Sequence, residues 1–114
     1  MTSDDTFELY DLEVTVEGDE KDFVCHHHAG HAFRVEGEDL VFPEGGRFSM
    51  YALAALIPLL PAKERPTSPN DWMTTDALIA CPDPNCGAKF RIHRTAKRIL
   101  SHAECTVVPL GAKA

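Results

Sequence analysis

The chain lacks a long apolar run. Its longest such stretch, Met50 to Leu60, contains Pro58 and is too short to cross a bilayer, since a spanning helix needs about 20 apolar residues. Residues 1–10 are acidic and hold no apolar segment, so we expect no secretory signal there. These absences predict a soluble, cytoplasmic protein without a membrane partner.

Basic residues are scarce at the start of the chain, and acidic residues are scarce at its end. Among many acidic residues, positions 1–22 contain Lys21 as their one basic side chain, whereas Glu104 is the one acid from position 88 onward. The formal net charge of the whole chain is −7. We expect the two ends to neutralise each other within one fold.

Cysteine and histidine are absent from the middle of the chain. All 4 cysteines and all 6 histidines lie within residues 25–31 or 81–105. In a reducing compartment, cysteines clustered with histidines favour a metal site over disulfides. If the chain were exported by another route, the cysteines could instead form two disulfides.

Two metal-binding turns, or knuckles, are indicated by a pattern that occurs twice. A glycine opens Gly-x-x-Phe-Arg-aliphatic at Gly30 to Val35 and again at Gly87 to Ile92, each time after a cysteine. A zinc knuckle pairs two thiolate or imidazole ligands in a tight turn, and a glycine beyond the second ligand gives the turn its backbone freedom. We predict one structural Zn²⁺ per chain, of the Cys3His type, with these ligands: Cys25, His28, Cys81 and Cys86.

Other ligand sets remain open at this point. One is a lengthened finger formed by Cys81, Cys86, His102 and Cys105. Such a finger would leave Cys25 and three histidines for a second, open site: His26, His28 and His31.

Single residues near the first knuckle have simpler interpretations. In an extended segment His27 should point away from His26 and His28 and be solvated. Cys25 beside imidazolium groups is a weaker candidate for a nucleophile, because no convergent carboxylate or oxyanion-stabilising feature supports it.

The apolar patterning predicts an α+β fold, a small and mostly antiparallel sheet with one buried helix and the two-knuckle metal site. We expect one domain over 1–114, with a basic C-terminal extension from about 94. The predicted strands are 7–16, 22–27, 31–36, 40–42, 76–81 and 89–93.

Two helices are predicted. Residues 49–57 are rich in Ala and Leu and apolar on all sides, so this helix should be buried on several sides and end near Leu60 at the prolines. A loop should occupy 63–70, and residues 95–103 could form a short terminal helix.

A resemblance covers residues 12–93. Its elements are Cys25, Gly30 to Val35, Pro43-Glu44-Gly45, the 49–57 helix, Trp72, and Cys81-Pro82-Asp83 before Phe90-Arg91-Ile92. In these motifs the chain resembles a family of small uncharacterised prokaryotic proteins, with knuckles like those of zinc ribbons. The family pattern has a cysteine just after Pro-Glu-Gly, where this chain has Gly46 and Arg47. For a family function that used this cysteine, the resemblance implies either that this chain has lost the function or that Cys86 replaces the missing cysteine. The resemblance implies a compact α+β fold and no established activity.

Three functions follow as hypotheses, and no catalytic residue can be named. The first is a zinc-stabilised binding or accessory protein with an unknown protein or small-molecule partner. The second is a metalloenzyme with an open, histidine-rich site. The third, a nucleic-acid binder, is disfavoured because the chain is acidic and no aromatic residues are interleaved with its basic cluster: Arg91, Arg94, Lys97 and Arg98.

Overall fold

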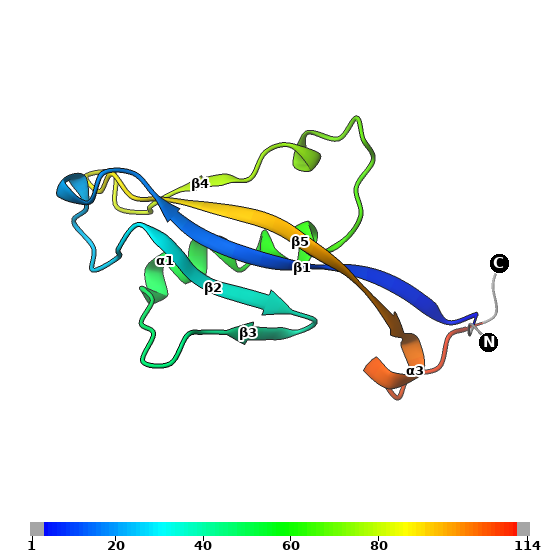
Figure 1. The fold of residues 1–114 in the computed structure, drawn as a ribbon. Helices are drawn as coiled ribbons and strands as arrows, with labels where there is room; N and C mark the ends of the chain where they lie inside the picture. Colours follow the sequence, from blue (N-terminus) through cyan, green and yellow to red (C-terminus); the bar gives the residue numbers. More distant parts are fainter. Residues whose placement is uncertain (1–3, 112–114) are drawn as a thin grey trace.

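A computed structural model describes residues 4–111 of the chain (Figure 1). Five antiparallel strands form one sheet in the order β3-β2-β1-β5-β4. The strands are β1 (Thr6–Glu17), β2 (Gly30–Glu36), β3 (Asp39–Val41), β4 (Leu78–Ala80) and β5 (Lys89–Ser101). The helices are α1 (Met50–Leu56), α2 (Leu60–Glu64) and α3 (His102–Cys105), with 3-10 turns η1 (Glu20–Asp22) and η2 (Trp72–Thr74). The α+β fold with a small antiparallel sheet is confirmed.

The long pair β1 and β5 forms the centre of the sheet. The register pairs Glu17 with Lys89 at one end and Thr6 with Ser101 at the other. The strands extend together as a twisted ribbon beyond the rest of the sheet (Figure 1). Acidic side chains of β1 face basic side chains of β5. For example, Arg98 donates to both carboxylate oxygens of Asp11 at 3.0 and 3.1 Å. The acidic start and the basic end of the chain therefore neutralise each other here, as expected.

The core lies between one face of the sheet and the helices. Alternate residues of β1 point into it, because side chains of a strand alternate between faces. Leu12 and Val14 from this strand are at most 1% exposed, and the rings of Phe33 and Phe90 are fully buried beside them. The knuckle phenylalanines are thus the largest side chains of the core.

Helix α1 confirms the predicted helix, with Ser49 as its N-cap. The Ser49 hydroxyl accepts a hydrogen bond from the Ala52 amide at 3.3 Å. The expectation that this helix is buried on several sides is wrong, because only Ala52 and Leu56, one turn apart, are fully buried, with Leu53 packed against the core beside them. Met50 and Tyr51 are 71% and 72% exposed.

Three segments differ from the sequence prediction. Residues 22–27 form no strand, since they bend out of η1 toward β2. The first two residues of the loop predicted over 63–70 belong instead to α2. This helix contains Pro61 in its first turn, where proline is tolerated. Most of the helix predicted over 95–103 is instead the continuation of β5 to Ser101, because β1 offers Thr6 to Asp11 as a pairing partner, and α3 begins at His102.

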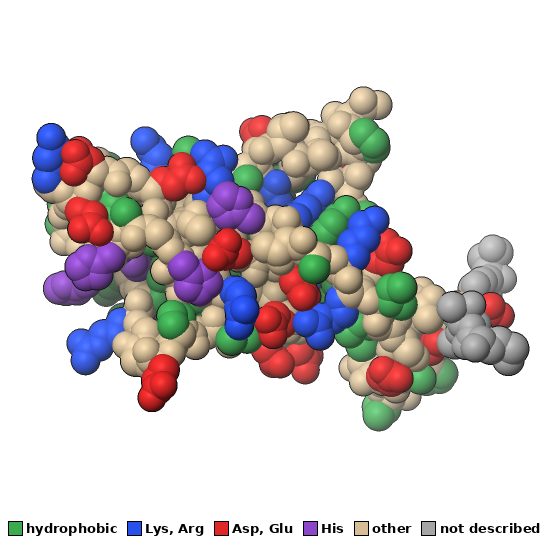
Figure 2. All heavy atoms as spheres, in the orientation of Figure 1, with side chains coloured by type: hydrophobic (Ala, Val, Ile, Leu, Met, Phe, Trp, Pro, Cys, Tyr) green, Lys and Arg blue, Asp and Glu red, His purple; other side chains and the backbone are tan. Residues whose placement is uncertain are grey.

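None of the helices within residues 4–111 is long and apolar enough to cross a membrane. Figure 2 shows histidine side chains gathered over the part of the molecule opposite the free end of the ribbon. The β1–β2 and β4–β5 connections also meet at that end (Figure 1).

Candidate metal centre

The β1–β2 and β4–β5 connections meet where β1 ends and β5 begins. The pairing of Glu17 with Lys89 brings the segment after β1 beside the segment before β5. The Gly87 amide donates to the Asp22 carbonyl at 2.8 Å, which fixes one connection to the other. A Cβ on Gly87 would lie 2.8 Å from the Asp22 Cβ, so glycine is what permits this approach.

Three thiols converge at this junction. The Sγ atoms of Cys25, Cys81 and Cys86 all lie within 4.8 Å of one another, and all three side chains are half-buried. Cys25 and Cys86 are 61 positions apart in the chain, yet their sulfurs are 3.4 Å apart. Every cysteine of the chain is a free thiol in the structure. Within residues 4–111 this is the one cluster of three or more potential metal ligands.

The backbone around Cys86 stabilises a thiolate. Burial opposes the charge of this thiol, but the amides of Ala88, Cys25 and Val24 outweigh it and lower the pKa of Cys86 to about 6. The Val24 amide donates to the Cys86 sulfur at 3.3 Å. Burial raises the pKa of both Cys25 and Cys81. The cluster thus contains one thiol whose lowered pKa favours the thiolate, beside two thiols that a cation would deprotonate.

The thiol geometry fits zinc. Zn–S bonds of about 2.3 Å in a tetrahedron place the sulfurs about 3.8 Å apart. The 3.4 Å separation of Cys25 from Cys86, and the 4.8 Å limit that includes Cys81, bracket this spacing. Three soft thiolates are also the donors that favour zinc over magnesium or calcium.

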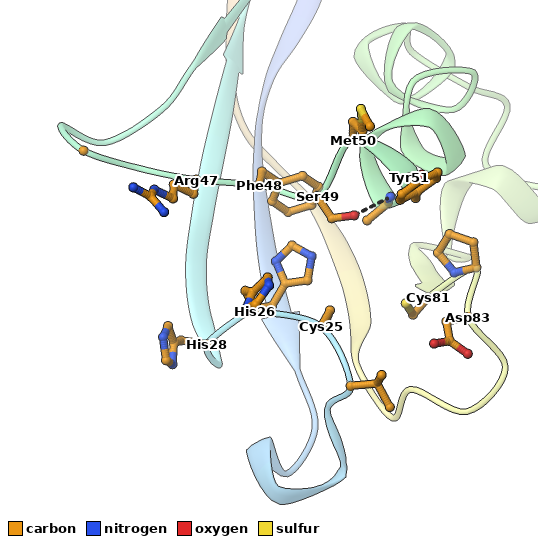
Figure 3. Close-up of a pocket in the computed structure, with 15 residues that line it drawn as sticks. Cys25, His26, His28, Arg47, Phe48, Ser49, Met50, Tyr51, Cys81 and Asp83 are labelled. Carbon is orange, nitrogen blue, oxygen red and sulfur yellow. Dashed lines mark hydrogen bonds between the residues drawn. The ribbon is translucent and has the colours of Figure 1, made fainter.

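The structure does not bring His28 to the thiols. Its side chain is 86% exposed, and its Nδ1 lies 3.6 Å from a carboxylate oxygen of Glu20. The same Glu20 oxygen accepts from the Ala29 amide at 2.8 Å, which holds the carboxylate beneath this turn. In Figure 3 His28 lies on the far side of Cys25 from Cys81. Exposure alternates from Cys25 to His28, so these two side chains leave the backbone on opposite sides.

The expectation that His27 is solvated is wrong. Its ring packs against Phe48 and Phe90, with ring centroids 4.6 and 5.1 Å away. Its Nε2 is buried without a hydrogen-bond partner, and burial lowers the pKa of the imidazole, with the charges of His26 and His28 adding to the effect. The sequence offered one signal for the burial of His27. It lies two residues after Cys25, and residues two apart in an extended segment point to the same side, here the inward one.

The remaining candidate ligands lie elsewhere. The finger formed with His102 and Cys105 is wrong, because β5 separates them from Cys86 by 13 residues, about 40 Å of extended strand. The His102 Nε2 instead lies 2.8 Å from the Val108 carbonyl. His31 Nδ1 lies 2.7 Å from a carboxylate oxygen of Glu13.

A pocket of about 950 Å³ opens beside the cluster, and Cys25 and Cys81 form part of its wall. Phe48, just before α1, together with Met50 and Tyr51 at the start of that helix, gives it an apolar side (Figure 3). The polar residues of its lining include His26, His27, His28, Arg47, Ser49 and Asp83. The exposed Met50 and Tyr51 of α1 therefore face this pocket.

No protein-family model, curated protein or solved structure matches this chain. The resemblance to the small prokaryotic family accordingly stays a prediction.

Proposed function

We propose that this chain is a cytoplasmic zinc-binding protein of the binding or accessory class. Cys25, Cys81 and Cys86 would hold one Zn²⁺ as thiolates. The observation that supports this most is the convergence of three free thiols from two connections, with one thiol already favoured as a thiolate. The fourth position of a tetrahedral zinc would be open, since no imidazole of residues 4–111 joins the three sulfurs.

The proposed ion would act as a staple at one end of the sheet. The connection that carries Cys25 has only one 3-10 turn of regular structure, and the connection that carries Cys81 and Cys86 has none. The hydrogen bonds that join the two connections include Gly87–Asp22 and Val24–Cys86. A cross-link between such segments stabilises the folded state by its binding free energy. The buried apolar core beneath them comes mainly from the strands and helices, and Ala88 is the one buried apolar residue that these connections add, so the metal should matter most for these connections.

The test measures zinc per chain by elemental analysis and native mass spectrometry of the purified protein. We expect one zinc, lost in Cys81→Ser and retained in Cys105→Ser, the matched control with an exposed and remote thiol. His28→Ala should also retain it. A chelator should lower the melting temperature of the wild type and speed proteolysis within 18–29 and 81–88. Absence of metal, or equal zinc in Cys81→Ser and the wild type, would contradict the proposal.

A second candidate function is a metalloenzyme, because a zinc with three protein ligands and an open position is the usual catalytic arrangement. The pocket beside Cys25 and Cys81 favours it. Three thiolates on a dication leave one negative charge, however, and this weakens the metal as a Lewis acid. A hydrolytic activity that is lost in His26→Ala while zinc is retained would favour the metalloenzyme over the binding or accessory protein.

The basic cluster gives a nucleic-acid partner little support. Arg91 is paired with Glu17, Lys97 lies 3.5 Å from Glu8, and Arg98 is paired with Asp11. Phosphate contacts would have to compete with these carboxylates.

A further inference from the structure

The exposed start of α1 faces the same pocket as the thiol cluster. We propose that this pocket binds a small molecule carrying a neutral aromatic nitrogen, such as an azole ring, and that this nitrogen is the fourth ligand of the metal. The inference rests on the proposed zinc centre and adds to it the chemical class of the ligand.

The need for an external donor follows from the ligand count. Three sulfurs occupy three of the four positions that zinc prefers. None of the three nearby imidazoles joins the three sulfurs, since the His27 ring packs between Phe48 and Phe90 with its Nε2 unpartnered, and His28 faces Glu20. His26 lines the pocket, and Figure 3 places it on the Arg47 side of Cys25, away from Cys81.

Charge selects a neutral donor. A zinc ion with three thiolates carries one net negative charge, so a second anion at the fourth position is disfavoured. The two ionised side chains of the pocket have opposite signs, with Arg47 on one side and Asp83 on the other (Figure 3). An aromatic nitrogen completes the common three-sulfur, one-nitrogen zinc site without adding charge.

The size of the pocket and its apolar side favour a ligand with an apolar ring. The volume of about 950 Å³ lies in the range of pockets that bind drug-sized ligands and far exceeds one water molecule. Tyr51 is 72% exposed and Met50 is 71% exposed at its wall, and both would lose water contact when a ring packs against them. A ligand with a donor nitrogen at one end and an apolar ring at the other matches both features.

The experiment uses the full chain loaded with one Co²⁺ in place of zinc, after metal stoichiometry has been measured. Failure to load one metal overturns the proposed zinc centre itself. With metal bound, 4-phenylimidazole should change the cobalt d–d spectrum saturably. Imidazole should do so only at higher concentration, and 1-phenylpyrrole, which has no basic nitrogen, should leave the spectrum unchanged.

Variants locate the ligand. Tyr51→Ala should weaken 4-phenylimidazole about threefold to tenfold, the range of one aromatic contact, and should leave imidazole unaffected. Trp72→Ala is the matched control, because Trp72 is 68% exposed and lies outside this pocket. Equal effects of the two variants would overturn the pocket as the site. An unchanged cobalt spectrum with 4-phenylimidazole, or a changed spectrum of ligand-free His26→Ala, would overturn the open fourth position.

Discussion

Glu64 at the end of α2 carries a buried carboxylate that lacks hydrogen bonds to Oε2. Its side chain is 6% exposed, and its Oε2 has no hydrogen bond. Burial raises the pKa of this carboxyl, Arg65 lowers it in part, and Asp11 raises it further. We predict that Glu64→Gln and Glu64→Met both stabilise the protein at pH 7. Glutamine removes the charge, while methionine also removes the buried polar atom at similar volume.

The size of the effect follows from the desolvation of one group. A buried, unpaired polar group costs about 1–3 kcal/mol, and a charged one more. We therefore expect the free energy of unfolding to rise by at least about 1 kcal/mol in Glu64→Met, which removes the buried polar group, and by the cost of the charge alone in Glu64→Gln, whose amide stays buried. Because the folded-state pKa is raised above the ordinary value of 4.5, the penalty exists at neutral pH and disappears as pH falls through the folded pKa toward 4.5. The difference between variant and wild type should shrink over that range.

Urea unfolding followed by far-UV circular dichroism, at pH 7 and near pH 5, measures this difference. With a urea slope of about 1–3 kcal/mol per molar, a gain of about 1 kcal/mol moves the midpoint by about 0.3–1 M. Comparing variant and wild type at one pH cancels any shared loss of metal. Glu38→Gln is the control, because Glu38 is exposed in the β2–β3 turn. Unchanged or reduced stability of Glu64→Gln at pH 7 would refute the reasoning.

Three further substitutions test the junction and the core. Gly87→Ala should weaken zinc binding, measured by competition with a coloured chelator, because its Cβ would clash with Asp22; unchanged affinity would contradict the close approach. Arg94→Met should cost about 1–3 kcal/mol in urea unfolding, since the guanidinium donates to two carbonyl oxygens at the end of α2 and lies 4.7 Å from the Tyr10 ring centroid. Phe33→Ala should cost about 3–5 kcal/mol in the same assay, because the ring is fully buried; a loss below 1 kcal/mol would show that the core is elsewhere.

Local patterns were sufficient for several elements. Alternation in residues 7–16 predicts β1, and a serine before an Ala/Leu-rich segment predicts α1, because both depend on neighbouring residues. The spacing of Cys81, Cys86 and Gly87 predicts a ligand turn for the same reason. The convergence of this turn with Cys25, read from the repeated Gly-x-x-Phe-Arg step, agrees with the three-thiol cluster.

Long-range contacts decided the rest. Residues 94–101 carry helix-forming side chains, yet they form strand because β1 extends far enough to pair with them, and tertiary pairing outweighs such weak propensities. This extension also removes His102 and Cys105 from the thiols.

The sequence by itself determined that cysteines of two distant turns belong together and that an antiparallel sheet joins them. Only the tertiary structure decided which side each histidine faces, since that depends on Phe48 and Phe90 covering His27 and on Glu20 facing His28. It likewise decided that the exposed start of α1 faces the thiols across a pocket. The physical reason is that ligand types and turns are local properties, whereas a coordination position and the cavity beside it exist only after separate elements have packed.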